Sequence, residues 1–377
     1  MKRGFYLVLF AILLFSCNQQ KQKPELPLLS VEAFTDTIDG SPVSLYTLKS
    51  GNGIIMQVTN FGGRVVSLWV PDKNGAYEDV VIGFDNIKDY KLKKNRTIGP
   101  VVGRFANRIA KGQFELDGVK YQLPINNNGN TLHSGPEGFD QKVWNVDKVT
   151  DNEIRMSYVS PDGEEGFPGT LTVKMVYSLT RDNEFKIAYE ATTDKPTIVN
   201  LSHHGLFNLK GHGNGTIEDN LLTLNASKIT VVDSLLIPTG EIAPVVGTPF
   251  YFRNPMVIGS RIKDENEQLR YGKGYDHNWV LDHRVPSEVE LVGSLYEPVS
   301  GRLMEIWTDQ PGVQIFSGNY QGSKGMGKYG KEIKPREVIA IETQKYPDSP
   351  NHSDFPSTRL NPGQTYKHTC IYKFLLQ

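Results

Sequence analysis

Residues 338–344 place a carboxylate, Glu342, directly after four apolar residues. Turn-forming residues follow from 346 to 351, and an apolar run bounded by turn signals predicts a strand buried on both faces. We expect Glu342 at the end of this strand, where partial burial raises the pKa of a carboxylate and makes it a proton acceptor. The local sequence alone favours the alternative, a structural glutamate in a surface salt bridge.

Two adjacent histidines, His203 and His204, lie within residues 200–209. Neighbouring side chains on a strand face opposite sides, so only one of the two can enter a given cleft. An imidazole titrates near neutral pH and suits proton donation. A metal site would combine one of these histidines with His212, Asp276 or His277. Because that spacing matches no compact ligand motif, no bound metal is expected.

Three further polar clusters contain candidate sugar ligands. Asn107 and Arg108 offer several hydrogen-bond donors in fixed geometry, which suit sugar hydroxyls, whereas the nearby Arg104 is predicted to be structural. His133 lies between a loop and a Gly-Pro turn, which is not a core position. Asp276, between a Gly-Tyr turn and an aromatic strand, either binds paired hydroxyls or caps an Asx turn.

The N-terminus has the pattern of a secretory signal. A basic start precedes an apolar stretch over residues 4–15, which is shorter than the about twenty residues that a membrane span needs. Residues 14–17 resemble a bacterial lipobox, in which the cysteine, here Cys17, is lipidated. Contact with a membrane is expected only through this lipid anchor. Asn18, in place of Asp, favours a periplasm-facing lipoprotein of the bacterial cell envelope, in the outer membrane.

The predicted organisation is a signal peptide over 1–16, a flexible stalk over 17–30 and one folded domain over 31–377. Lys plus Arg (41) nearly balances Asp plus Glu (42), and no long run of one sign occurs, so nucleic-acid partners are not expected. Cys370 is the only cysteine besides Cys17, and we expect a small buried apolar residue rather than half of a disulfide. A monomer and a homodimer both stay open.

Short alternating strands dominate the domain. Residues 117–118, Asp-Gly, are the strongest hairpin signal, because a primed turn needs positive φ. Residues 171–179, apolar at every odd position, are predicted to pair with 185–189. Residues 303–307 are expected to form a further hairpin with 313–316.

Helical patterns are confined to residues 86–94 and 262–269. The predicted fold class is therefore all-β, a large antiparallel sandwich of stacked sheets. Residues 322–329 nearly spell a phosphate-binding loop, but Tyr329 replaces the magnesium-binding Ser or Thr. A flexible loop rich in Gly and Lys is expected there instead.

Together these segments resemble the aldose 1-epimerase (galactose mutarotase) family, whose motifs they match in order along nearly the whole chain. The matching segments are 103–109, 131–133, 160–169, 200–209, 238–240, 274–277, 311–314 and 342–344. The resemblance implies a galactose mutarotase-like supersandwich. It also implies interconversion of the α and β anomers of free aldoses such as glucose and galactose, without a metal or an organic cofactor.

The resemblance further implies residue roles. Glu342 would be the general base and His204 the general acid, while His203 falls where many relatives have Asn. Sugar hydroxyls would be bound by Asn107, Arg108, His133, Asp276 and Gln314. A base that starts ionised and an acid that starts protonated predict a bell-shaped pH dependence. Leu206, where the family often has Tyr, and Tyr251, where Asp is common, put the sugar preference in doubt.

Two other functions would use the same residues differently. A glycoside hydrolase would employ Asp276 and Glu342 as paired carboxylates, but it leaves His204 without a clear role. A non-catalytic sugar-binding lipoprotein on the same fold would not need both Glu342 and His204. The prediction is therefore an aldose 1-epimerase.

Overall fold

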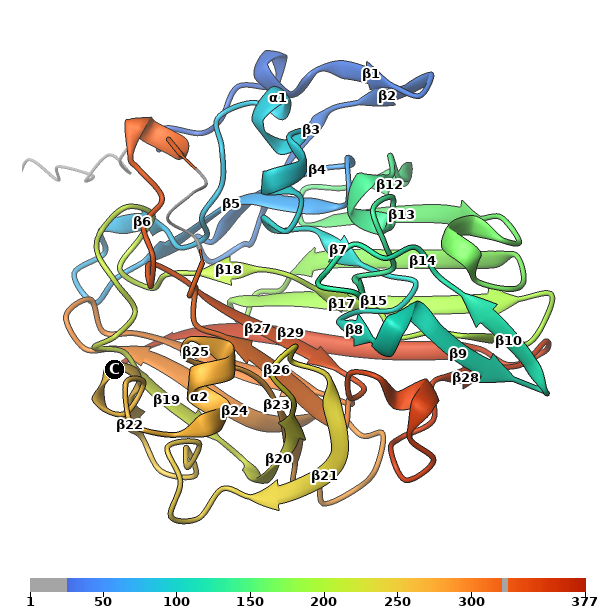
Figure 1. Ribbon diagram of the computed structural model, residues 1–377. Helices are drawn as coiled ribbons and strands as arrows, with labels where there is room; N and C mark the ends of the chain where they lie inside the picture. Colours follow the sequence, from blue (N-terminus) through green and yellow to red (C-terminus); the bar gives the residue numbers. More distant parts are fainter. Residues whose placement is uncertain (1–25, 321–324) are drawn as a thin grey trace, which may run out of the picture.

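The computed structural model describes residues 26–320 and 325–377, so the predicted signal peptide, Cys17 and most of the predicted stalk lie outside the described residues. Figure 1 shows a molecule built of stacked strands. The described part contains two short α-helices, α1 (Ile87–Tyr90) and α2 (Glu267–Gly272). The all-β sandwich prediction is confirmed. None of the described helices is long and apolar enough to cross a membrane.

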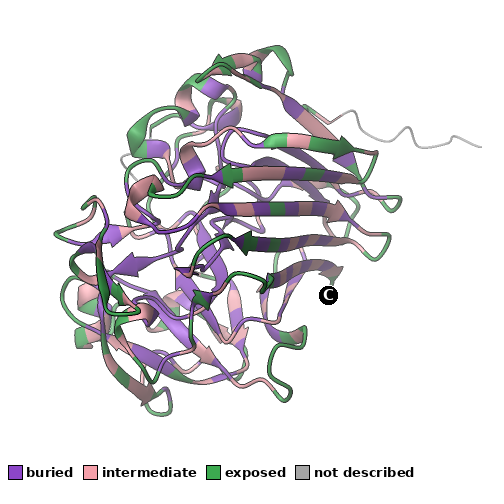
Figure 2. Cartoon of the chain, turned by 90° about the vertical axis from the view of Figure 1, so that its right-hand side faces the viewer, coloured by how far each residue is buried: buried purple, intermediate pink, exposed green. Residues whose placement is uncertain are grey.

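The largest sheet has nine antiparallel strands, and their side chains alternate between core and solvent, which gives the banded strands of Figure 2. The predicted pairing of β14 (Leu171–Leu179) with β15 (Glu184–Thr193) is confirmed, from Leu171 opposite Thr193 to Leu179 opposite Phe185. In spatial order the strands are β12 (Asn145–Val149), β13 (Glu153–Ser160), β14 (Leu171–Leu179), β15 (Glu184–Thr193), β29 (Tyr366–Leu376), β25 (Arg302–Thr308), β24 (Glu290–Glu297), β19 (Leu221–Leu224) and β22 (Met256–Val257).

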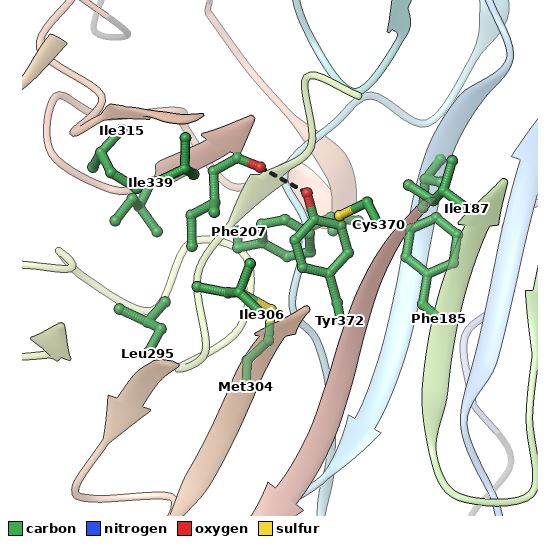
Figure 3. Packing of buried hydrophobic residues seen from close by; sticks show 14 of the residues in the cluster. Phe185, Ile187, Phe207, Leu295, Met304, Ile306, Ile315, Ile339, Cys370 and Tyr372 are labelled. Atoms are coloured by element: carbon green, nitrogen blue, oxygen red, sulfur yellow. Dashed lines mark hydrogen bonds between the residues drawn. The ribbon is translucent and has the colours of Figure 1, made fainter. Parts of the chain in front are cut away.

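A six-stranded antiparallel sheet packs against the nine-stranded one and carries three of the polar candidates, Asp276, Gln314 and Glu342. Its strands, in spatial order, are β18 (Leu206–Phe207), β27 (Ile339–Gln344), β26 (Gly312–Phe316), β23 (Asp276–Leu281), β20 (Ala226–Val232) and β21 (Pro238–Pro244). Between the sheets, Ile315 and Ile339 meet Ile306 and Tyr372 in one apolar cluster (Figure 3). The Tyr372 hydroxyl donates to the Ile341 carbonyl at 2.6 Å, so the two layers are also joined by a buried hydrogen bond.

The remaining strands cover the edges. A four-stranded sheet holds β3 (Leu45–Lys49), β4 (Ile55–Thr59), β5 (Arg64–Pro71) and β6 (Tyr77–Asp79). Two-stranded ladders pair β1 (Asp36–Ile38) with β2 (Ser41–Val43), β7 (Val101–Val102) with β17 (Ser202–His203), β8 (Arg108–Ile109) with β11 (Thr131–Leu132), β9 (Gln113–Leu116) with β10 (Val119–Gln122), and β16 (Thr197–Ile198) with β28 (Arg359–Leu360). Short 3-10 turns lie at Glu32–Phe34, Lys93–Asn95, Ala110–Gly112, Phe139–Gln141, Glu164–Gly166, Ile258–Ser260, Lys328–Gly330 and Ser349–Asn351.

Several local predictions hold, while others differ from the structure. Asp117 and Gly118 have φ values of 54° and 77°, as a primed turn requires. The expected hairpin of β25 with β26 does not form, because β25 pairs with β24 and β29 while β26 pairs with β23 and β27. The turn between them carries the chain from one sheet to the other. The second helix begins at Glu267, where the Asn266 side chain caps it, rather than at 262.

Candidate active site

Three neighbouring strands present a row of polar side chains on one face of the six-stranded sheet. Asn278 on β23 lies opposite Gln314 on β26, which lies opposite Glu342 on β27. Residues opposite one another in a ladder share a face, so these side chains are neighbours. Glu342 lies inside β27 rather than at its end, and its side chain is only 2% exposed. The surface salt bridge that the local sequence favoured is therefore wrong.

His204 lies beside Glu342 because of how the next strand pairs. It directly follows β17 and lies two residues before Leu206, which pairs with Ala340 of β27. The His204 Nε2 and Glu342 Oε1 atoms are 3.6 Å apart. The backbone of His204 is held at both ends, since its N–H donates to Pro100 at 2.8 Å and its carbonyl accepts from Gly99 at 3.2 Å. The acid and base candidates are thus held side by side.

His203 faces the opposite way, as the strand period predicts. Its ring packs against Tyr177 and Phe185, with centroids 5.9 and 5.7 Å away. Burial lowers the pKa of His203 to about 3, so this imidazole stays neutral. Only His204 of the pair reaches the cleft.

Arg108, Asp276 and Gln314 form a connected polar chain next to Glu342. The Arg108 guanidinium contacts Asp276 Oδ2 at 3.2 Å, and the Gln314 Nε2 donates to Asp276 Oδ1 at 2.7 Å. Asp276 is 8% exposed. These contacts are with side chains, so the Asx-turn alternative for Asp276 is not what the structure shows.

His133 is held in one protonation state and one tautomer. Its Nδ1 accepts from the Asn107 N–H at 3.1 Å, which leaves Nε2 to carry the hydrogen of the neutral ring. Burial is the main cause that lowers the pKa of His133 well below its usual value, and the nearby charge of His204 adds to the shift. The ring lies edge-on to His204 at 5.3 Å. His133 is therefore a neutral hydrogen-bond donor beside the His204–Glu342 pair.

These side chains surround a cavity of about 470 Å³. The cavity is lined by Asn107, Arg108, His133, His204, Asp276 and Glu342. Gln314 does not line it but donates a hydrogen bond to Asp276. The cavity also touches residues that the sequence did not single out, namely Thr97, Asn127, Asn128, Leu132, Ser234, Leu235, Leu236, Tyr271, Lys273, Phe316 and Tyr320. The sequence marked Asn127 and Asn128 only as polar loop residues, and nothing in their local pattern distinguishes Lys273 or Tyr320.

The two departures from the family motifs lie elsewhere. Leu206 is buried in a second apolar cluster, and Tyr251 packs against the main core. Neither residue lines the cavity. The expectation that they affect sugar preference therefore finds no support in the geometry. Arg104 has the structural role predicted for it, since its guanidinium donates to oxygens of Ser160, Pro161, Pro168 and Gly169.

The electrostatics favour a strong base at Glu342. Burial, reinforced by the charge of Asp276 and opposed by Arg108, raises the pKa of Glu342 to about 8. A carboxylate with this pKa is a stronger base than an ordinary one, and the ionised form that abstracts a proton becomes the main form only above about pH 8. Its Oε2 has no hydrogen-bond partner among the described residues and is available to a ligand.

His133, His204 and Glu342 bring potential metal-ligand atoms within 4.8 Å of one another. The hydrogen bond from the Asn107 N–H occupies the lone pair of His133 Nδ1, and Nε2 carries a hydrogen, so neither ring nitrogen offers a free lone pair. The grouping of His203 or His204 with His212 or His277 is not assembled, since His212 packs near Tyr329 and His277 near Phe250.

An acid–base pair surrounded by hydrogen-bonding side chains in a β-sandwich defines an enzyme that moves protons on a small polyhydroxylated molecule. A family model described as aldose 1-epimerase matches residues 44–373. The galactose mutarotase of Bos taurus is 41% identical over 319 residues, covering 85% of this chain and 90% of that protein. The aldose 1-epimerase of Escherichia coli K12 is 32% identical over 344 residues, covering 90% and 97%.

Solved structures agree with the sequence relatives. The aldose epimerase homologue from C. elegans has a TM-score of 0.82 and 29% identity, covering 89% of this chain and 99% of that one. The galactose 1-epimerase from Lactobacillus acidophilus has a TM-score of 0.79 and 27% identity, covering 90% and 97%. This chain belongs to the aldose 1-epimerase family and is an isomerase of that class.

Proposed function

We propose that this enzyme interconverts the α and β anomers of free hexoses of the glucose and galactose type by acid–base ring opening and closure. The observation that supports this most directly is the 3.6 Å separation between His204 Nε2 and Glu342 Oε1 in the cavity. The anomeric hydroxyl oxygen and the ring oxygen of a pyranose are bonded to the same carbon. A base and an acid that lie side by side can therefore each reach one of them.

In the forward half-reaction Glu342 takes the proton of the anomeric hydroxyl. The electron pair of that O–H bond forms the carbonyl at C1, the bond from C1 to the ring oxygen breaks, and His204 gives its proton to the departing ring oxygen. Rotation about the C1–C2 bond then exposes the other face of the aldehyde. The released hydroxyl attacks that face, His204 takes back its proton, and Glu342 returns its proton to the carbonyl oxygen.

The other polar side chains hold the sugar while its ring opens. Arg108 and Asp276 offer a donor and an acceptor fixed by their mutual contact, and Asn107 lies next to Arg108. The Nε2–H of the neutral His133 can donate to a sugar oxygen without competing for the transferred proton. Gln314 keeps Asp276 in place. Correct orientation of the hydroxyls contributes to the rate because it holds C1 against the acid–base pair.

We further propose that the chain is a lipoprotein of the bacterial cell envelope, anchored at Cys17, in the outer membrane and facing the periplasm. The basic start, the short apolar stretch and the lipobox-like residues 14–17 support this. Radiolabelled palmitate should enter the wild-type protein and not Cys17→Ser.

The proposed reaction is tested by following the optical rotation of freshly dissolved α-glucose and α-galactose with purified protein. Wild type should accelerate the approach to equilibrium, while Glu342→Gln and His204→Ala should not. Glu297→Gln is the matched control, because Glu297 is equally buried but binds backbone N–H groups of Val299 and Ser300 away from the cavity. No acceleration by the folded wild-type protein would refute the proposal.

A further inference from the structure

The strand that carries Glu342 loses its backbone partner on one side just before the catalytic residue. On the His204 side, β27 pairs with β18 only at Ile339 and Ala340. Past Ala340 the backbone of β27 has no ladder partner on this side among the described residues, and both His204 and Glu342 line the cavity there. A strand edge without ladder hydrogen bonds is held less firmly, so something else must fix the catalytic part of β27 against the His204 segment.

Two side chains from residues 200–204, here called the His204 segment, take the place of the missing ladder hydrogen bonds. The Ser202 hydroxyl donates to the Thr343 carbonyl at 2.9 Å. The Asn200 Oδ1 accepts from the Lys345 N–H at 2.9 Å, and the Asn200 Nδ2 donates to the Lys345 carbonyl at 3.2 Å. Asn200 is fully buried, at 0% exposed. Both backbone groups of Lys345, three residues after Glu342, are thus bound by one side chain.

The same asparagine also holds the segment that supplies Asn107 and Arg108. Its Nδ2 donates to the Ala106 carbonyl at 3.3 Å, and its own carbonyl accepts from the Ala106 N–H at 2.6 Å. The Asn200 N–H donates to the Arg104 carbonyl at 2.9 Å. Asn200 therefore joins three segments that are distant in sequence and that each contribute to the cavity.

We propose that Asn200 is a positioning residue that sets the spacing of Glu342, His204 and Arg108. It touches neither the cavity nor the reacting atoms. Its effect passes through the backbone of Lys345 and Ala106 to the neighbouring catalytic and binding residues. This inference rests on the proposed function, because it concerns the geometry of that acid–base pair.

The chain contains a closely matched control in Asn60, which is 4% exposed. Its Oδ1 accepts from the Ser44 N–H at 2.9 Å, and its Nδ2 donates to the carbonyls of Pro42 and Trp144 at 3.0 and 3.1 Å. The side chain makes the same set of three bonds to backbone, but it joins segments that do not line the cavity. Replacing either asparagine by alanine removes equivalent interactions.

The test compares Asn200→Ala and Asn60→Ala by thermal unfolding and by mutarotation kinetics. Both should lower Tm by a similar amount. Asn200→Ala alone should lower kcat, by about 10²-fold as expected for a displacement of roughly 1 Å, while KM changes little. Asn200→Ala should also shift the pH profile of kcat/KM, because the substitution alters the surroundings of the Glu342 carboxylate and with them its pKa. An unchanged kcat in folded Asn200→Ala, or an equal kcat loss in Asn60→Ala, would overturn the inference.

If Asn200→Ala does not fold, Ser202→Ala provides the same test with a smaller change. It removes the single bond to Thr343, and its kcat should fall while Tm drops less than in Asn60→Ala. If Ser202→Ala keeps the wild-type kcat, the inference that residues 200–202 position Glu342 is contradicted. Inactive wild-type protein in the same assay would instead refute the proposed reaction, so the two failures are distinguishable.

Discussion

Among the buried charged side chains of the described residues, two groups differ in how their hydrogen bonds are completed. The first, here called the Lys328 cluster, consists of Lys328, Asp79 and Tyr329. Lys328 is 0% exposed. Its ammonium group donates to the carbonyls of Val66 and Val81 at 2.7 and 2.9 Å and to Asp79 Oδ2. The Tyr329 hydroxyl donates to the same carboxylate at 2.8 Å.

The second group, the catalytic cluster, consists of Glu342, His204, Asp276, Arg108 and Gln314. No hydrogen-bond partner among the described residues is present for the buried atoms Glu342 Oε2, Gln314 Oε1 and Arg108 Nε. Burial, and after it the charge of the second carboxylate, Asp276, raises the pKa of Glu342. All these side chains surround or support the cavity.

The difference separates a structural role from a chemical one. A buried ion pair with every donor and acceptor satisfied stabilises its surroundings against opening, and breaking it is costly. A buried carboxylate that has an unpartnered oxygen and a neighbouring like charge is less stable, but it is ready to accept a proton or bind a hydroxyl. Substitutions in the two clusters should therefore have opposite effects on stability and activity.

The largest effect is expected for Glu342→Gln, which should lower kcat by at least about 10²–10⁴-fold because the proposed general base is lost. Its stability should not fall. The pKa of Glu342 is raised from 4.5 to about 8 on folding, so the folded state binds the proton more tightly and wild-type stability declines as pH rises through this window. Glutamine does not titrate, so the variant should be more stable than wild type at pH 8, by an amount on the order of a few kcal/mol.

Urea unfolding at pH 4.5 and pH 8, together with optical rotation kinetics, measures both properties. The difference in stability between variant and wild type should be small at the lower pH, where the carboxyl is protonated in the folded state and about half protonated in the unfolded state. A variant that is destabilised at pH 8 would contradict the view that Glu342 is kept at a cost to the fold.

Lys328→Met should have the opposite profile. Methionine leaves the Asp79 carboxylate buried without its cation, and breaking a buried pair in this way costs about 3–5 kcal/mol. The kcat of the folded fraction should stay at the wild-type value, since Lys328 does not line the cavity. Urea unfolding gives the stability, and mutarotation at low temperature gives kcat.

Lys91→Met is the matched control for this change. Lys91 pairs with Asp36 at 2.9 Å, but both side chains are partly exposed, so the loss should be below about 1 kcal/mol. If Lys328→Met and Lys91→Met lose equal free energies of unfolding, burial does not determine how much the Lys328 cluster contributes to stability.

Much of the fold follows from short-range patterns. The period of two identified β14 and β15, and the Asp-Gly pair identified the turn between β9 and β10. The strand of Glu342 was recognisable from its apolar residues. The turn between β25 and β26 shows what such patterns cannot decide, because turn residues mark where the chain changes direction and not which sheet the next strand joins.

The site was harder to predict than the fold. His204 and Glu342 meet because β18 pairs with β27 and because the Ser202 and Asn200 side chains bind the end of β27 and Lys345 after it, and nothing local to either residue indicates these contacts. Their roles came from the resemblance of ordered motifs. Lys328 illustrates the reverse error, since its Gly-rich surroundings predicted a flexible loop, yet its partner Asp79 lies 249 positions away and makes the lysine fully buried. In both clusters, the environment of the charged side chains is set by partners that are distant in the sequence, which local patterns do not reveal.

A third prediction concerns the pH dependence of the catalytic cluster. The charge of Asp276 raises the pKa of Glu342, so Asp276→Asn should lower that pKa and move the acidic limb of kcat/KM to lower pH, on the order of one unit. Arg108, freed from its partner, would add to the shift. Asp219→Asn, which removes a surface carboxylate paired with Lys210, should leave the limb in place. If the acidic limb of the kcat/KM profile is unchanged in Asp276→Asn, the carboxylates of Asp276 and Glu342 do not interact.

The smallest effect is expected for Tyr251→Asp, which restores the residue common in the resembling family. Tyr251 packs against the core, its carbonyl accepts from the Arg261 guanidinium at 2.5 Å, and its side chain does not line the cavity. The ratio of kcat/KM for galactose to that for glucose should therefore be unchanged. Parallel assays of the two sugars with the variant and wild type measure this ratio directly. A clear change would mean that a residue outside both clusters transmits its effect to the sugar, and the contrast between a satisfied and an unsatisfied buried cluster would no longer suffice to locate function in this molecule.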